Sequence, residues 1–174
     1  MRFRGSGAIA IGGNDGSAGQ VITSSGSGAA PQWKSPTNTL YQSTNMNSTA
    51  AAITPTPGTL TLVPGLSQTV SVSGNAKLLV QYAVQASSGV CLGCSNSVAE
   101  IDLTLNGGLA NRMEYELINS SHTTMAGGWL MSVGPGSYTI EVKAELLTGP
   151  SVTFGCGTGC GGYNSYLIVQ VIPE

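Results

Sequence analysis

The stretch from Gly127 to Leu147 places the strongest constraint on the fold of this chain. From Tyr138 onward, apolar residues alternate with polar or charged ones, and the two sets would lie on opposite faces of a β-strand. A shorter alternation precedes it, and Gly134-Pro135-Gly136 between the two has the composition of a turn. The pattern predicts a β-hairpin, which needs further strands to cover its apolar face. The apolar set is Tyr138, Ile140, Val142, Ala144 and Leu146.

Further strand patterns follow one another at short spacing from residue 59 to the C-terminus. The segment from Glu100 to Leu105 alternates strictly and runs into Asn106-Gly107, a strong hairpin signal. We expect eight strands, and this number favours an all-β sandwich, specifically an eight-stranded jelly roll. The expected strands are Thr59–Val63, Thr69–Ser73, Lys77–Ala86, Ala99–Leu105, Arg112–Ile118, Gly128–Val133, Tyr138–Leu147 and Ser165–Ile172.

The last of these strands is apolar on both faces apart from Gln170. A strand with two apolar faces lies between the core and another layer. Because a second copy of the chain could supply that layer, we expect subunit contacts from this strand, and we assign them to Leu167, Val169 and Val171.

Composition limits the class of protein. Of 174 residues, 8% are charged, against roughly 25% in a typical soluble domain. So few charges suit an extracellular or virion surface, or a surface covered by copies of the same chain. The formal net charge is −2 and the six basic residues are scattered, which argues against nucleic-acid binding. No apolar run approaches the roughly 18 residues of a membrane span, and the first residues lack the apolar stretch of a signal peptide.

Three regions differ in composition. Residues 1–36 are rich in Gly, Ser and Ala with isolated apolar residues, so this arm alone cannot bury enough surface to offset its ordering entropy. It is either disordered or ordered by wrapping around partner chains. Residues 37–58 are polar, with Pro and Gly toward the end, and are expected to form a linker or an extended first strand. Residues 59–174 carry the strand patterns and form the expected head domain.

The most specific pattern in the sequence lies between Gly16 and Trp33. It resembles the element GxAGQVLTSxGxGxxPxW, which occurs in the shafts of bacteriophage tail fibres and related trimeric surface fibres; Ile22 stands where Leu is usual. The resemblance implies a small β-turn-β unit, three copies of which would bury Val21, Ile22 and Trp33 around a shared axis. The alternative is a flexible Gly/Ser linker.

A looser resemblance covers the C-terminal part. The hairpin containing GxYTIEVKA and the final strand LIVQVIPE are similar to the C-terminal heads of phage fibres and spikes, which are trimers with a jelly-roll or tumour-necrosis-factor-like arrangement. The two resemblances together imply a homotrimer located in the virion. Residues 1–36 would attach it to other virion structural proteins, and head-domain loops would bind a host surface glycan or outer-membrane component non-covalently. The alternatives are a structural or decorating virion protein without a receptor, or a bacterial secreted carbohydrate-binding module.

The four cysteines form two pairs in Gly- and Ser-rich loops, Cys91 with Cys94 and Cys156 with Cys160. Four thiolates could hold a structural zinc ion, and disulfides between the loops could form in oxidising surroundings. Free thiols are the third alternative. In the first two cases we expect the two pairs to lie close together in the fold.

Catalytic residues are not evident. The single histidine, His122, has no second histidine and no carboxylate within four residues. The acidic residues occupy alternate positions on the polar strand faces, and no pair is marked out for a glycosidase, which needs two converging carboxylates. We therefore expect no enzymatic activity, and no cofactor apart from the zinc alternative. The acidic residues in question are Glu100, Asp102, Glu114, Glu116, Glu141 and Glu145.

Overall fold

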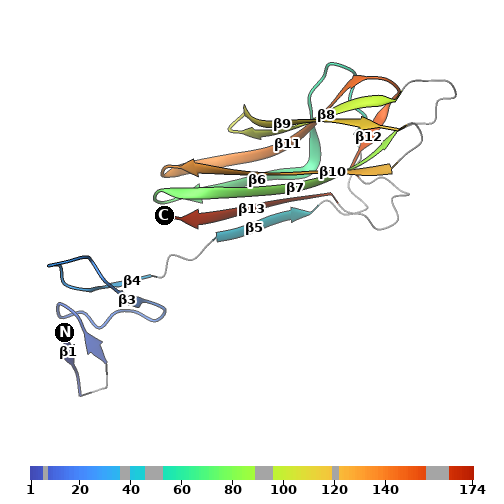
Figure 1. Cartoon of the computed structure of the whole chain (residues 1–174). Coiled ribbons are helices and arrows are strands. Elements are labelled where there is room, and N and C mark those ends of the chain that lie inside the picture. The colour runs from blue at the N-terminus through green and yellow to red at the C-terminus, as the bar shows by residue number, and fades with distance from the viewer. Residues whose placement is uncertain (6–7, 36–39, 46–52, 89–95, 119–121, 156–164) are drawn as a thin grey trace. The chain divides into compact units, whose positions relative to one another are not determined.

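The computed structural model describes residues 1–5, 8–35, 40–45, 53–88, 96–118, 122–155 and 165–174 (Figure 1). The chain divides into two compact units, Met1–Asn38 and Thr39–Glu174. All regular structure in the described residues is β-strand. No helix in these ranges is long and apolar enough to cross a membrane.

The N-terminal unit consists of two small antiparallel ribbons. Strand β1 (Arg2–Phe3) pairs with β2 (Ile9–Ala10), and β3 (Val21–Thr23) pairs with β4 (Gln32–Lys34). Such two-stranded ribbons are at best marginally stable alone. An ion pair between Arg4 and Asp15, with Nε and Oδ1 at 2.6 Å, adds one polar tie within the unit.

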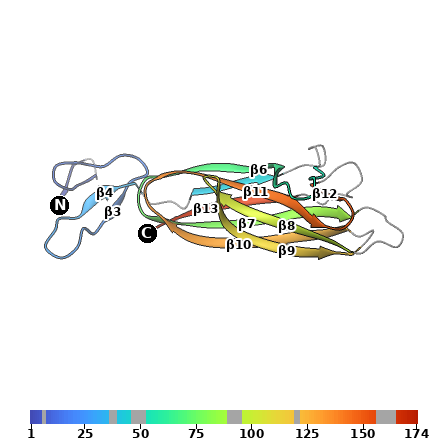
Figure 2. The ribbon, with the colours of Figure 1, turned by 90° about the horizontal axis from the view of Figure 1, so that it is seen from above.

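The C-terminal unit is a β-sandwich of two antiparallel sheets (Figures 1 and 2). One sheet has the strand order β10-β7-β13-β5, with the short β12 also paired to β7; the other has the order β6-β11-β8-β9. The strands are β5 (Leu40–Asn45), β6 (Thr61–Val72), β7 (Ala76–Ser88), β8 (Ser97–Leu105), β9 (Gly108–Leu117), β10 (His122–Val133), β11 (Gly136–Thr148), β12 (Val152–Phe154) and β13 (Tyr166–Pro173).

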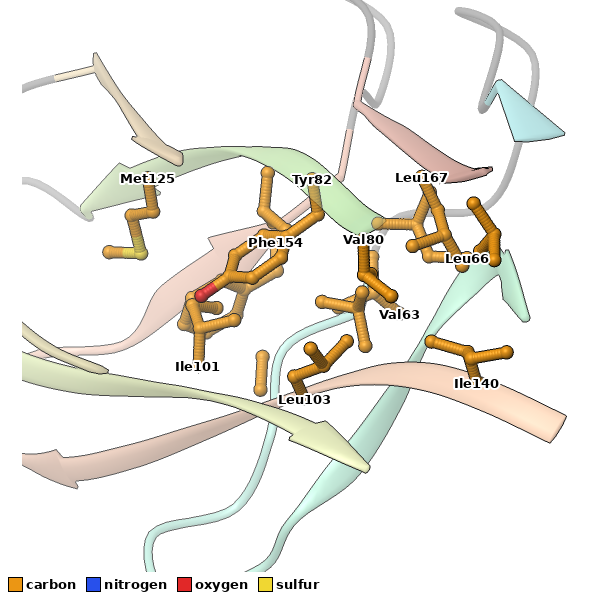
Figure 3. Packing of buried hydrophobic residues seen from close by; sticks show 14 of the residues in the cluster. Val63, Leu66, Val80, Tyr82, Ile101, Leu103, Met125, Ile140, Phe154 and Leu167 are labelled. Carbon is orange, nitrogen blue, oxygen red and sulfur yellow. The ribbon is translucent and has the colours of Figure 1, made fainter. Parts of the chain in front are cut away.

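The hydrophobic core lies between the two sheets and is supplied by alternate residues of each strand. On β11, Ile140, Val142, Ala144 and Leu146 are buried, which confirms the inward set predicted from the sequence. Figure 3 shows side chains from both sheets meeting in this layer, among them Tyr82, Ile101, Leu103, Phe154 and Leu167.

The hairpin predicted at Asn106-Gly107 is present and joins β8 to β9. Leu105 pairs with Gly108, which leaves two residues in the turn. Asn106 has a φ of 48° and Gly107 a φ of 80°. Positive φ at both central residues is what a two-residue turn of this kind requires, and Asn-Gly adopts it at low cost.

Two of the expected strands, Thr59–Val63 and Thr69–Ser73, belong largely to one continuous strand, β6. Pro64 and Gly65 look like a chain turn in the sequence, but the register of β6 against β11 shifts here. Leu62 pairs with Lys143 and Ser67 with Glu141, so five steps along β6 correspond to two along β11. The residues between Leu62 and Ser67 form a bulge. Proline is tolerated at this place because β6 is an edge strand.

Strand β5 lies in the region 37–58, for which the sequence predicted either a linker or an extended first strand, and it pairs with β13. In the head, β12 was not among the expected strands. Strand β12 has three residues and extends the sheet beside the end of β7. A three-residue strand is too short to produce a recognisable alternation.

Candidate functional site

Charged residues are concentrated on one outer face of the sandwich, here called the charged face. It is the outer face of the sheet β6-β11-β8-β9, and it carries six of the eight acidic residues of the chain together with Arg112 and Lys143. The alternate residues of the same strands point into the core. The six acidic residues are Glu100 and Asp102 on β8, Glu114 and Glu116 on β9, and Glu141 and Glu145 on β11.

Two of these carboxylates are buried although they belong to an outer face. Glu100 is 2% exposed and Asp102 is 1% exposed. Arg112, on the neighbouring strand β9, donates from Nε to Asp102 Oδ1 at 2.9 Å and from Nη2 to Asp102 Oδ2 at 2.8 Å. This bidentate pair fixes the guanidinium over the two carboxylates. The alternation of polar and apolar faces was predicted from the sequence, but Glu100 and Asp102 are not exposed to solvent as that prediction implied, because Arg112 covers them.

Glu100 is less well satisfied than Asp102. Its Oε1 lies 2.9 Å from Arg112 Nε, which is close enough for an ion pair. The N–H of Arg112 is directed to Asp102, however, and Glu100 Oε1 has no hydrogen-bond partner of its own. Burial and the neighbouring Asp102 raise the pKa of Glu100, and the charge of Arg112 opposes this. Glu100 is thus a buried carboxyl group between a like charge, that of Asp102, and the opposite charge of the Arg112 guanidinium.

The register places six of the eight charged residues of this face in two cross-strand rows. Glu100 is the direct partner of Glu114 on β9 and of Glu145 on β11. In the adjacent row, Asp102 is the direct partner of Arg112 and Lys143. The second row alternates in sign, whereas the first row contains three glutamates, here called the glutamate row. Like charges directly opposite each other destabilise a sheet.

The outer face of β10, β7 and β13, here called the neutral face, has a contrasting composition. Its rows are set by the pairing of β7 with β10 on one side and β13 on the other. It contains apolar, amide and small side chains, and the ion pair of Lys77 and Glu174, at 3.6 Å, lies near one end. The residues are Ala126, Gly128 and Leu130 on β10, Leu79, Gln81 and Ala83 on β7, and Tyr166, Ile168, Gln170 and Ile172 on β13.

The structure corrects the sequence assignment of subunit contacts on β13. Leu167, Val169 and Val171 are 0%, 0% and 5% exposed and pack in the core of the same chain. They cannot reach a second copy while the sandwich is intact. The other face of β13, with Tyr166, Ile168 and Ile172, is the one turned outward. The sequence indicated that both faces are apolar, but only the sheet packing shows which face the core covers.

The N-terminal unit separates the three residues expected to make shaft contacts. Ile22 is the direct partner of Trp33 across the β3–β4 ribbon, so their side chains share a face. Val21 is adjacent in sequence and lies on the opposite face. Val21 and Ile22 are both exposed. Trp33 is half-buried and donates from Nε1 to the carbonyl oxygen of Asn14 at 3.1 Å.

Gly16 allows Trp33 to take this position, and replacing it tests the arrangement. A Cβ at residue 16 would lie 2.7 Å from Cδ2 of Trp33, and the φ of Gly16 is +73°. We expect Gly16→Ala to displace the indole and shift its fluorescence to longer wavelength, measured in a Trp129→Phe background that leaves Trp33 as the single tryptophan. Gly19→Ala is the control, because Gly19 has a similar φ of +86° but no atom within 4 Å of the added Cβ. Equal spectra for the two variants would contradict this packing.

The four cysteines expected to bind zinc or form disulfides lie outside the described residues. The prediction that the two pairs are close together therefore also concerns residues outside this range. The cysteines are Cys91, Cys94, Cys156 and Cys160.

His122 is the first residue of β10 and is exposed. It borders a shallow hollow of about 390 Å³ together with Gln85, Thr123 and Thr124.

Comparisons with known proteins do not identify a family. No family model matches the chain, and no curated protein matches it. Among solved structures, it is similar to a β-glucosidase from Paenibacillus barengoltzii (15% identity, TM-score 0.31, 65% of this chain and 10% of that chain). It is also similar to a cycloisomaltooligosaccharide glucanotransferase from Paenibacillus sp. (12% identity, TM-score 0.32, 74% of this chain and 18% of that chain). A third similar structure is that of the T13 IBDV viral particle (10% identity, TM-score 0.34, 88% of this chain and 40% of that chain). The chain spans between 10% and 40% of the length of these structures.

Proposed function

We propose that this chain is a homotrimeric fibre or spike protein of a virion. In this proposal, residues 1–36 attach it to other virion structural proteins and contribute a short shaft. The head binds a host surface glycan or outer-membrane component non-covalently through its loops, and three copies raise a weak affinity per site. The protein performs no catalysis. The element from Gly16 to Trp33, which resembles the shafts of phage tail fibres, supports this assignment.

The observation that carries the proposal is the contrast between the two outer faces of the head. The charged face carries six carboxylates, four of which are not buried, against two basic residues, so two such faces would repel each other. The neutral face has an apolar centre that includes Leu79, Leu130 and Ile168. An exposed apolar surface of this kind is typical of an interface. The neutral face is therefore the surface of the head that we assign to contacts between copies.

The strand pairing supports the finer description of the head as a jelly roll. Antiparallel pairs are nested along the chain: β5 pairs with β13, β6 with β11, β7 with β10, and β8 with β9. The first strand thus pairs with the last and each later pair lies inside the previous one. This nesting supports the assignment of the head as a jelly roll, to which β12 would be a short addition.

The first test is the oligomeric state of the full-length protein. We expect light scattering after gel filtration to return the mass of three chains. Without residues 1–36, the head should still fold and its trimer should dissociate more readily on dilution, because the exposed apolar residues of the arm no longer contribute. A full-length protein that stays monomeric at every concentration would overturn the homotrimer.

The second test concerns attachment. Virions produced with a deletion of residues 1–36 should lack the protein, as measured by immunoblotting of purified particles. Incorporation of the truncated protein at the normal level would contradict the role of the arm. If particles lacking the whole protein adsorbed normally to cells, a structural or decorating protein without a receptor would be the correct assignment.

A further inference from the structure

Tyr82 of β7 carries a buried hydroxyl close to β9 and β10, each of which is the edge strand of its sheet. The residue is 1% exposed, and its ring lies in the core between the two sheets (Figure 3). Within the described residues its hydroxyl has no hydrogen-bond partner, although a buried hydroxyl normally has one. Burial, with a smaller contribution from the neighbouring Tyr115, raises the pKa of Tyr82. The hydroxyl is therefore a neutral donor without an acceptor.

The sulfur of Met113 lies next to this hydroxyl. A Cβ added to Gly127 on β10 would lie 2.6 Å from the hydroxyl oxygen of Tyr82 and 2.9 Å from Sδ of Met113, so both atoms border the space that the missing side chain leaves. Met113 is the direct partner of Ile101, a core residue, which places its side chain on the core side of β9. It is only half-buried, so a small oxidant can reach it from solvent.

Tyr115 beside them already uses its own proton. Its hydroxyl donates to the carbonyl oxygen of Ala126 at 2.9 Å, whereas Met113 Sδ is 3.6 Å from the same hydroxyl. A thioether sulfur is a weak acceptor, but oxidation converts it into a polar sulfoxide. An oxygen bonded to Sδ would therefore place a strong acceptor beside Tyr82, the donor that has none.

We propose that Met113 is a site of oxidation by peroxides, and that the Tyr82 hydroxyl donates a hydrogen bond to the sulfoxide that forms. Hydrogen peroxide transfers one oxygen atom to Sδ: the O–O bond breaks, an S–O bond forms, the sulfur is oxidised by two electrons and the peroxide leaves as water. Methionine sulfoxide commonly disrupts a core because it is polar, and sulfoxide reductases restore the thioether. Here a donor already faces the added oxygen. This inference does not depend on the proposed function.

The first test is treatment of the folded full-length protein with hydrogen peroxide, followed by peptide mass mapping. We expect Met113 to gain one oxygen while Met125 remains unmodified, because Met125 is fully buried in the core. Treatment with a methionine sulfoxide reductase should then remove the added oxygen. If Met113 stayed unmodified for as long as Met125, the proposed oxidation site would be wrong.

Thermal unfolding tests the part played by Tyr82. Oxidation of Met113 should leave the unfolding midpoint nearly unchanged in the original chain. In Tyr82→Phe the same oxidation should lower the midpoint by roughly 2–4 °C, the shift expected in a chain of this size for about one missing hydrogen bond. Tyr82→Phe should itself fold, because the hydroxyl that it removes makes no hydrogen bond in the described residues.

Met113→Leu is the matched control in both backgrounds. It removes the sulfur at nearly constant volume, so its response to peroxide measures the effect of the other methionines, which is then subtracted. A midpoint shift from Met113 oxidation that is the same with and without the Tyr82 hydroxyl would overturn the proposed hydrogen bond.

Discussion

Replacing Leu167 by Ala should lower the free energy of unfolding by about 2–5 kcal/mol, whereas replacing its neighbour Ile168 by Glu should leave the fold intact and dissociate the oligomer. The two residues are adjacent on β13 but face opposite ways. Leu167 is fully buried in the core, so its truncation leaves a cavity. Ile168 is on the neutral face, where three added carboxylates per trimer would be buried without partners.

Urea unfolding followed by circular dichroism measures the free energy of unfolding of Leu167→Ala. Gel filtration with light scattering measures the oligomeric state of Ile168→Glu. Ser71→Glu is the matched control, because it adds the same charge at an exposed position of β6 in the opposite sheet; it should leave the oligomer unchanged. The proposed interface would be wrong if Ile168→Glu remained trimeric. The assignment of the core face would be wrong if Leu167→Ala unfolded at the same urea concentration as the original protein.

Replacing Phe154 by Ala should lower the free energy of unfolding by about 3–5 kcal/mol, which is typical of a buried aromatic residue. Phe154 belongs to the three-residue strand β12, and its side chain is fully buried among core residues of both sheets (Figure 3). Its backbone is held on both sides: Phe154 and Ile53 exchange N–H···O bonds of 2.7 and 2.9 Å, and the N–H of Gly155 donates to the carbonyl of Gln85. Because the backbone is held by these hydrogen bonds, it cannot move inward to fill the cavity that loss of the ring would leave.

Thr153→Val provides the comparison on the same strand. The hydroxyl of Thr153 contacts that of Thr54 at 3.1 Å on the exposed side, and its loss should cost about 0.5–1.5 kcal/mol. Both variants are measured by urea unfolding at constant pH and protein concentration. Similar losses for Phe154→Ala and Thr153→Val would show that the core does not depend on β12.

Local sequence patterns determined most of the strands of the head and the face that several of them bury. The alternation from Tyr138 to Leu147 identified the inward set of β11, and Asn106-Gly107 located the turn between β8 and β9. These features depend on residues close in sequence: side chains alternate with a period of two, and a tight turn needs particular residues at two positions. Sequence also indicated that β13 is apolar on both faces.

The same patterns could not locate features that depend on which strands become neighbours. They did not show that Leu167 faces the core and Ile168 faces outward, because the period of two is the same for either choice. They did not reveal the cover that Arg112 provides for Asp102, or the glutamate row, because Glu100 and Glu145 are brought together only by the register of β8 against β11. A period of two determines which residues of one strand share a face. The packing of distant strands determines whether that face is covered, and by which side chains.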